Sequence, residues 1–341
     1  MAGTIGPRAT RVRRAIVRPM LRSRSRRRLA ALTVLLGLAL VLSAGPVAAL
    51  PGSYPHQSHG NRGVDVKALQ HLLRHHGFTV PMHGNFDGAT VRAVESFQKA
   101  RGLPVTGAAD RATWTAIRVP LGPGSTGEAV LGLQRLLNEK RLAKLALTGV
   151  FDGATRSAVL AFQKHAGLPA TGDAPPTTWR ALLAHLELPV WGGRLCDYSV
   201  GNGPANWGTA AAIGQLQAAA DRVVALGHGR VALGDIGFEH GGDIPGHSTH
   251  AHGLDVDLRP MRDARDQCRW GTSWRWTTYD RSATRDLIKA IRAAAPGHVK
   301  LIYFNDPVLI REGLVTWYAG HDDHLHVRYC ERSHPVARYD C

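Results

Sequence analysis

The chain has 341 residues, of which 44% are hydrophobic and 20% charged, so its composition excludes wholesale disorder and a polytopic membrane protein. The formal charge is +16, but ten arginines and no acidic residue fall within residues 1–50, and the remainder holds 32 Lys and Arg against 26 Asp and Glu. This modest excess argues against a nucleic-acid partner and suits an anionic surface. The length predicts two or three domains.

Residues 1–49 have the order of an export signal. An Arg-rich start is followed by the apolar run Leu29 to Ser43, then by Gly45 and Pro46, and then by the small residues Val47 to Ala49. The run is shorter than the ~20 apolar residues of a membrane span, so we expect cleavage and no span in the mature protein. Retention as an anchor, and export by the general or the twin-arginine route, stay open as alternatives.

A sequence pattern recurs once at an offset of 65 residues. Its members are F-D-G-A-T at 86–90 and 151–155, F-Q-K at 97–99 and 162–164, G-L-P at 102–104 and 167–169, and tryptophans 114 and 179. Two copies at this period indicate tandem small domains rather than a solenoid.

Each copy predicts a small helical bundle. Leu69, Leu72 and Leu73 have the spacing of one helix face. Asp87 is a candidate N-cap for the next helix, and Gly102 is a candidate end for it. Because large apolar residues are usually buried, we expect the repeated Leu, Phe and Trp side chains to form the core.

The repeated order L-Q-x-L-L, F-D-G-x-T, F-Q and T-G resembles the peptidoglycan-binding domain of bacterial wall hydrolases. The resemblance covers residues 61–118 and 125–186, with 50–60 as a linker. It implies peptidoglycan as a binding partner. We assign no ligand-contacting residue in either repeat, and the oligomeric state is left unassigned.

All four cysteines lie in the last 150 residues, and none forms a C-x-x-C pair. In an exported chain an even count predicts two disulfides, and the spacing leaves all three pairings open for Cys196, Cys268, Cys330 and Cys341.

Histidines concentrate in two short windows, which hold seven of the 18 in the chain: 240–252 and 321–326. Each window runs into alternating polar and apolar residues, typical of a strand, so that Asp255 and Asp257 would share one face, as would His324 and His326. If the two strands are neighbours, imidazoles and carboxylates converge. Such a set without thiolates suits a catalytic Zn²⁺ with three protein ligands and one water.

The spacings H-x6-D and H-x-H resemble the lysostaphin, D-Ala-D-Ala metallopeptidase and hedgehog group of zinc folds. The residues around them, 246–257 and 321–328, are closer still to penicillin-insensitive murein endopeptidases, and 301–305 is similar to the strand that those enzymes carry between the motifs. The similarity covers about 190–330.

The resemblance implies one zinc ion per chain and a role for each matching residue. The implied ligands are His250, Asp257 and His326. His324 would lie beside the metal-bound water, as general base or to orient the water and the oxyanion. His247 and His321 would contact the substrate or the transition state.

Two further residues are noted beside this set. Asp255 shares a face with Asp257, and could replace it as ligand or hold a ligating imidazole from behind. His240 matches no motif, and we assign it no role.

The sequence therefore predicts a multidomain protein: two all-α bundles, then an α+β zinc peptidase domain at 190–341 with a central antiparallel sheet. The expected function is a secreted or wall-associated zinc endopeptidase that cuts peptide cross-links of peptidoglycan. The alternatives are a D,D-carboxypeptidase, an L-alanyl-D-glutamate endopeptidase, or a non-catalytic wall-binding protein.

Overall fold

The computed structural model describes residues 54–199 and 204–341. The predicted export signal at 1–49 lies outside the described residues. Within the described residues, none of the helices combines the length and the apolar character that crossing a bilayer requires.

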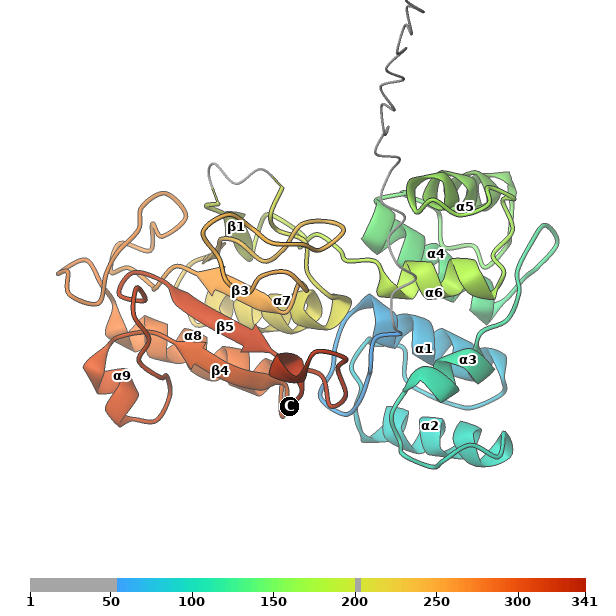
Figure 1. The fold of residues 1–341 in the computed structure, drawn as a ribbon, viewed down its shortest axis with the longest axis horizontal. Helices are drawn as coiled ribbons and strands as arrows, with labels where there is room; N and C mark the ends of the chain where they lie inside the picture. The colour runs from blue at the N-terminus through green and yellow to red at the C-terminus, as the bar shows by residue number, and fades with distance from the viewer. Residues whose placement is uncertain (1–53, 200–203) are drawn as a thin grey trace, which may run out of the picture. The chain divides into compact units, whose positions relative to one another are not determined.

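The N-terminal part consists of two successive sets of three helices (Figure 1). The first set is α1 (Val64–His75), α2 (Gly88–Ala100) and α3 (Arg111–Ile117), and the second is α4 (Glu128–Arg141), α5 (Gly153–His165) and α6 (Pro176–Ala184). The helical prediction for both repeats is confirmed.

The recurring aspartate begins the second helix of each set. The carboxylate of Asp87 accepts a hydrogen bond from the backbone nitrogen of Thr90 at 2.9 Å, and Asp152 accepts from Thr155 at 2.8 Å. Each bond satisfies a backbone donor that the helix itself leaves unpaired, worth about 1 kcal/mol. The N-cap predicted from F-D-G-A-T is therefore confirmed in the first copy and recurs in the second.

The two bundles share one hydrophobic core instead of forming separate ones. Helix α1 packs against α4, and a Cβ placed on Gly132 of α4 would come within 3.2 Å of His71 Cβ on α1, so a larger residue there would push the two helices slightly apart. The shared core includes the paired leucines of both copies, namely Leu69, Leu72, Leu73, Leu133, Leu136 and Leu137.

The C-terminal part is built around a five-stranded sheet in the order β1-β2-β3-β5-β4 (Figure 1). Its strands are β1 (Leu195–Asp197), β2 (Val231–Leu233), β3 (Asp255–Leu258), β4 (Val299–Tyr303) and β5 (Leu325–Tyr329). The sheet is mixed: β1 and β2 are parallel, and the other three pairs are antiparallel as predicted. The parallel pair arises because the long helix between β1 and β2 returns the chain in the same direction.

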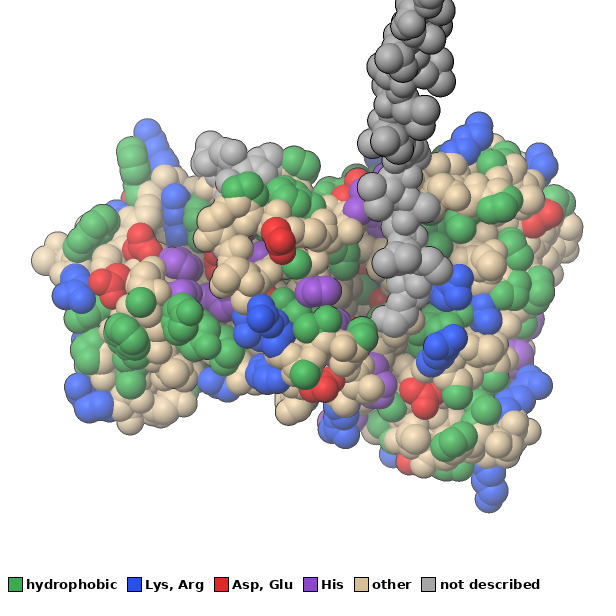
Figure 2. Space-filling view, in the orientation of Figure 1, with side chains coloured by type: hydrophobic (Ala, Val, Ile, Leu, Met, Phe, Trp, Pro, Cys, Tyr) green, Lys and Arg blue, Asp and Glu red, His purple; other side chains and the backbone are tan. Residues whose placement is uncertain are grey.

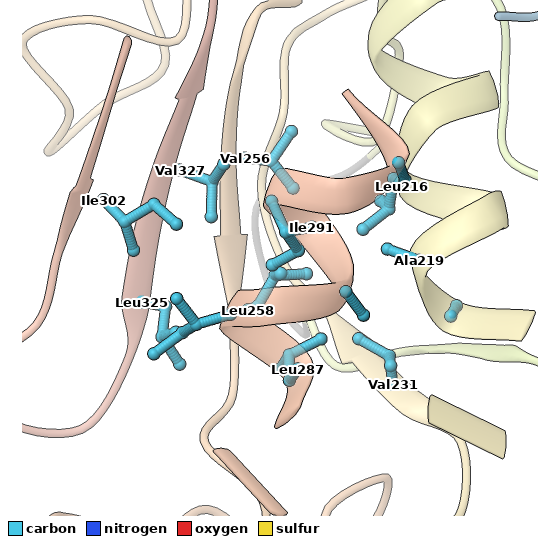
Figure 3. Packing of buried hydrophobic residues seen from close by; sticks show 14 of the residues in the cluster. Leu216, Ala219, Val231, Val256, Leu258, Leu287, Ile291, Ile302, Leu325 and Val327 are labelled. Atoms are coloured by element: carbon cyan, nitrogen blue, oxygen red, sulfur yellow. The ribbon is translucent and has the colours of Figure 1, made fainter. Parts of the chain in front are cut away.

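Two helices cover one face of this sheet. Leu216 of α7 (Ala210–Ala225), Ile291 of α8 (Arg281–Ala294), and Val256 and Val327 of the strands belong to one hydrophobic cluster, in which Ile291 lies next to the strands (Figure 3). The apolar half of each alternating strand is thus buried against helices, and the polar half faces the other way. The remaining elements are α9 (Pro307–Arg311) and a 3-10 turn (Ala337–Tyr339).

Two disulfides join the four cysteines, as the even count predicts. Cys196 on β1 pairs with Cys268, and Cys330 pairs with Cys341. The second bond holds the segment after β5 close to the sheet, and this segment contributes Tyr339 to the site described next.

Candidate metal centre

The two histidine windows meet on adjacent strands. In the β3–β5 ladder Asp257 is the direct partner of His326, and Asp255 is the partner of Arg328. Since side chains alternate across a strand, the four polar side chains share the sheet face that α7 and α8 do not cover. The convergence expected from the sequence patterns is therefore present.

The side chains of His250, Asp257 and His326 bring their nitrogen and oxygen atoms close together. His250 Nε2 is 3.2 Å from His326 Nδ1 and 3.4 Å from Asp257 Oδ2, and His326 Nδ1 is 3.0 Å from Asp257 Oδ1. Two ligands of a tetrahedral zinc, each about 2.0–2.1 Å from the ion, are about 3.3 Å apart. The spacing of these three side chains fits a single small cation.

Both imidazoles are held from behind by an acceptor. His250 Nδ1 donates to the carbonyl oxygen of Ile236 at 3.2 Å, and His326 Nε2 donates to Asp255 Oδ1 at 2.9 Å. These bonds keep a proton on the far nitrogen of each ring. The near nitrogen faces the other two side chains of the set and is the atom that a bound cation would take as its ligand. This arrangement of acceptors is typical of histidines that bind metals.

Asp255 is a buried acceptor with several donors. Besides His326, it accepts from Arg328 Nε at 2.6 Å and from the Tyr339 hydroxyl at 2.7 Å. Burial alone would raise the pKa of the Asp255 carboxyl, but the hydrogen bond from His326 and the charges of His326 and Arg328 outweigh it and lower the pKa to about 2. Asp255 is therefore ionised and positioned behind a candidate ligand.

Asp257 is also ionised. Its burial opposes the charged form, yet hydrogen bonds from His250 and His326 hold its pKa below the ordinary value of 3.8. A carboxylate in this state is the form that binds a cation.

The backbone around His250 is unusual. His250 has φ = 22°, and it is one of four non-glycine residues with positive φ in the described part of the chain. Gly253 has φ = 68°, and a Cβ there would lie 3.0 Å from Gly208 Cα. The motif glycine is thus required where the loop turns tightly into β3.

His247 lies beside the three candidate ligands. Its Nδ1 is 3.6 Å from Asp257 Oδ2, its Nε2 is 3.1 Å from Asp235 Oδ2, and its ring centroid is 4.3 Å from that of His250. Donor atoms of His247, His250 and Asp257 all lie within 4.8 Å of one another. Sequence reasoning missed Asp235, for which the only signal is its position directly after the apolar strand β2.

His321 and His324 lie next to one another at the edge of this group. Their ring centroids are 4.6 Å apart, and the centroid of His321 is 5.7 Å from that of His326. His324 Nδ1 is 3.0 Å from Asp323 Oδ1, and its side chain is partly exposed.

A cavity of about 390 Å³ opens onto the site. His247, Asp257 and His324 all line it. Its other walls include the residues just after β1 and the loop that follows Cys268. The remaining lining residues are Tyr198, Ser199, Gly234, Asp235, Arg259, Gly271, Thr272, Trp276 and Asp323. Figure 2 shows histidine side chains gathered near acidic ones over this part of the sheet. A polymer segment can therefore reach Asp257, the candidate ligand that lines the cavity, together with His247 and His324.

Comparison with protein families agrees with this geometry. Residues 62–117 and 126–182 each match the putative peptidoglycan binding domain, and residues 201–302 match the penicillin-insensitive murein endopeptidase family. The chain carries two peptidoglycan-binding domains followed by a murein endopeptidase domain. The matches cover both helical repeats and the first part of the C-terminal domain.

The endopeptidase match covers part of the candidate site. It includes His247, His250 and Asp257, while His324 and His326 lie beyond its last residue. His326 on β5 is nevertheless connected to the matched region, because β5 pairs with β3 in the sheet.

One solved structure is similar over a short stretch. It is a peptidoglycan-binding protein from Clostridioides difficile, 39% identical, with a TM-score of 0.18; the match covers 18% of this chain and 39% of that one. A comparison with curated proteins finds no match.

Proposed function

We propose that this protein is a secreted, zinc-dependent endopeptidase that hydrolyses peptide cross-links in peptidoglycan. The observation that carries the proposal is the convergence of His250, Asp257 and His326, whose nitrogen and carboxylate oxygen atoms approach one another to 3.0–3.4 Å beside an open cavity. Nitrogen and carboxylate donors without thiolate are the ligand type of catalytic zinc. We assign the peptidase domain to 190–341.

Zinc, when bound at such a site, lowers the pKa of a coordinated water to about 7 and polarises a carbonyl oxygen. His324 lies at the cavity wall, and we assign it the proton transfer from the attacking water or the orientation of that water. His247, whose ring is next to that of His250, and His321, whose ring is near that of His326, are assigned to contacts with the substrate or transition state.

Secretion is proposed on two grounds. The first is the order of residues 1–49, and the second is the pair of disulfides, which persist in oxidising compartments. Binding repeats on the same chain raise the effective concentration of the enzyme at an insoluble polymer.

Mass spectrometry of purified peptidoglycan after digestion, with and without a chelator, tests the proposal. Conversion of cross-linked dimers into monomers, abolished by the chelator and restored by zinc, is the expected result. Released D-alanine would indicate a carboxypeptidase, and cleavage between L-alanine and D-glutamate would indicate the other endopeptidase type. Intact fragments after incubation with zinc-loaded protein would indicate a non-catalytic wall-binding protein.

A further inference from the structure

A second cluster of histidines lies away from the candidate metal centre. His165 is the last residue of α5, His185 follows α6, and His240 lies in the loop after β2. One ring nitrogen from each of them lies within 4.8 Å of the other two. The cluster therefore joins the second binding repeat to the endopeptidase domain.

Distances within the cluster match those between ligands of one ion. Nε2 of His165 is 3.4 Å from Nε2 of His185, close to the about 3.3 Å expected between two ligands of tetrahedral zinc. A carboxylate completes the group: Glu239 Oε1 is 3.0 Å from His165 Nε2 and 3.5 Å from His185 Nε2, and its Oε2 is 4.0 Å from His240 Nε2.

His185 is oriented as a metal-binding histidine would be. Its Nδ1 donates to the carbonyl oxygen of Leu186 at 2.5 Å, which leaves Nε2 with a lone pair directed at the cluster. The rings of Phe162 and Trp207 contact the imidazole edge to face, each with centroids 5.9 Å away, and hold its plane.

The cluster is accessible to an ion from solvent. The side chain of His185 is 6% exposed, whereas those of His165 and His240 are 26% and 52% exposed. Arg141 pairs with Glu239 and fixes the carboxylate next to the histidines. Because that guanidinium is a cation, it offsets part of the attraction for a metal, and the three neutral imidazoles have to supply most of the affinity.

We propose that His165, His185 and His240, with Glu239, form a second metal site that binds a divalent transition metal of the zinc type. Imidazole-rich donor sets favour such ions over Ca²⁺ and Mg²⁺. The bound ion would cross-link the second repeat to the loop after β2, a structural role separate from hydrolysis. The inference does not depend on the proposed function, since no residue is shared between the two sites.

Metal content measured on the whole protein tests the proposal. Purified protein is equilibrated with Zn²⁺ and dialysed, and bound zinc per chain is determined by mass spectrometry. We expect two ions in the wild type, one in His240→Ala, one in Asp257→Ala and none in the double variant. His83→Ala is the control, because this histidine is similarly exposed and outside both clusters, and it should keep two.

Thermal unfolding supplies a readout that does not involve activity. In the Asp257→Ala background, Zn²⁺ should raise the melting temperature, and adding His165→Ala or His240→Ala should abolish that shift. His240 is half exposed, so its removal leaves the fold intact. One zinc per chain in the wild type that Asp257→Ala removes, or two in both His165→Ala and His240→Ala, would overturn the second site. Two ions retained in Asp257→Ala would instead contradict the ligand set of the proposed function.

Discussion

His326 donates from Nε2 to Oδ1 of Asp255 over 2.9 Å, while its other ring nitrogen faces Asp257. Asp255 thus fixes the ring from one side, and the nitrogen on the other side, which contacts Asp257 here, is the one that would bind an ion. Asp255 also binds Arg328 and Tyr339, so four side chains from β3, β5 and the C-terminal turn determine how His326 is presented.

Asp255→Asn should therefore weaken zinc binding without removing a ligand. The amide keeps the shape of the carboxylate but loses its charge, and loss of a partner behind a ligand costs about 10–100-fold in metal affinity. Chelator competition measures the change. Asp286→Asn is the control, since Asp286 pairs with His228 at the surface, and it should leave the affinity unaltered. Equal affinity in both folded variants would disprove the role of Asp255.

His324 and His326 should respond differently to removal although only one residue separates them. His326→Ala should lose zinc and activity together because it deletes a proposed ligand. His324→Ala should retain zinc and slow hydrolysis by about 10²–10⁴, the usual contribution of a general base. Zinc content and turnover of a cross-linked fragment are measured on the same samples. An empty site in His324→Ala would reverse the two assignments.

The two disulfides should differ in what they stabilise. The first disulfide closes a loop with a sequence separation of 72 residues and the second a loop of 11. The loss of chain entropy in the unfolded state predicts that they stabilise the fold by about 4 and about 3 kcal/mol, respectively. Replacing Cys196 and Cys268 by Ala should lower the free energy of unfolding more. Replacing Cys330 and Cys341 should also weaken zinc binding, because Tyr339 lies between them in sequence and donates to Asp255. Denaturant unfolding and chelator competition separate the two effects; zinc affinity lowered equally by both double variants would contradict the assignment.

A buried glutamate should make stability depend on pH. Burial raises the pKa of Glu187 from its ordinary value of 4.5 to about 8, despite the nearby Lys140. Between these values the folded state binds more protons than the unfolded state, so stability falls as pH rises from 4.5 to 8.

Glu187→Gln should remove this dependence. The free energy of unfolding of the variant, taken relative to that of the wild type, should increase by on the order of 3 kcal/mol between pH 5 and pH 8. Urea unfolding at both pH values measures it. Taking the difference between variant and wild type cancels the titration of all other groups. A difference that does not change with pH would show that Glu187 ionises normally in the folded protein.

Periodicity in the sequence predicts the parts of this fold that depend on interactions between residues close together in the chain. The spacing of the repeated leucines predicts helices, and Asp87 predicts a cap, because both depend on neighbours within four residues. The alternation around Asp257 and His326 predicts the polar sheet face for the same reason, and the register then brings the two strands together.

Features that depend on contacts between distant segments are not predictable this way. Asp235 comes close to His247 through the pairing of β2 with β3, and its position after an apolar strand is the one signal that its own neighbours give. His240 matches no motif, and its partners come from a separate repeat. The shared core of the two bundles likewise depends on how α1 meets α4, which neither repeat shows alone.

That shared core limits how the chain can change. The leucines on α1 and α4 cover each other, so deleting either repeat would expose a large hydrophobic surface on the remaining repeat and promote aggregation. The pair should melt as one cooperative unit, and gene rearrangements that gain or lose a single copy would be selected against by misfolding, independently of any change in attachment to the wall.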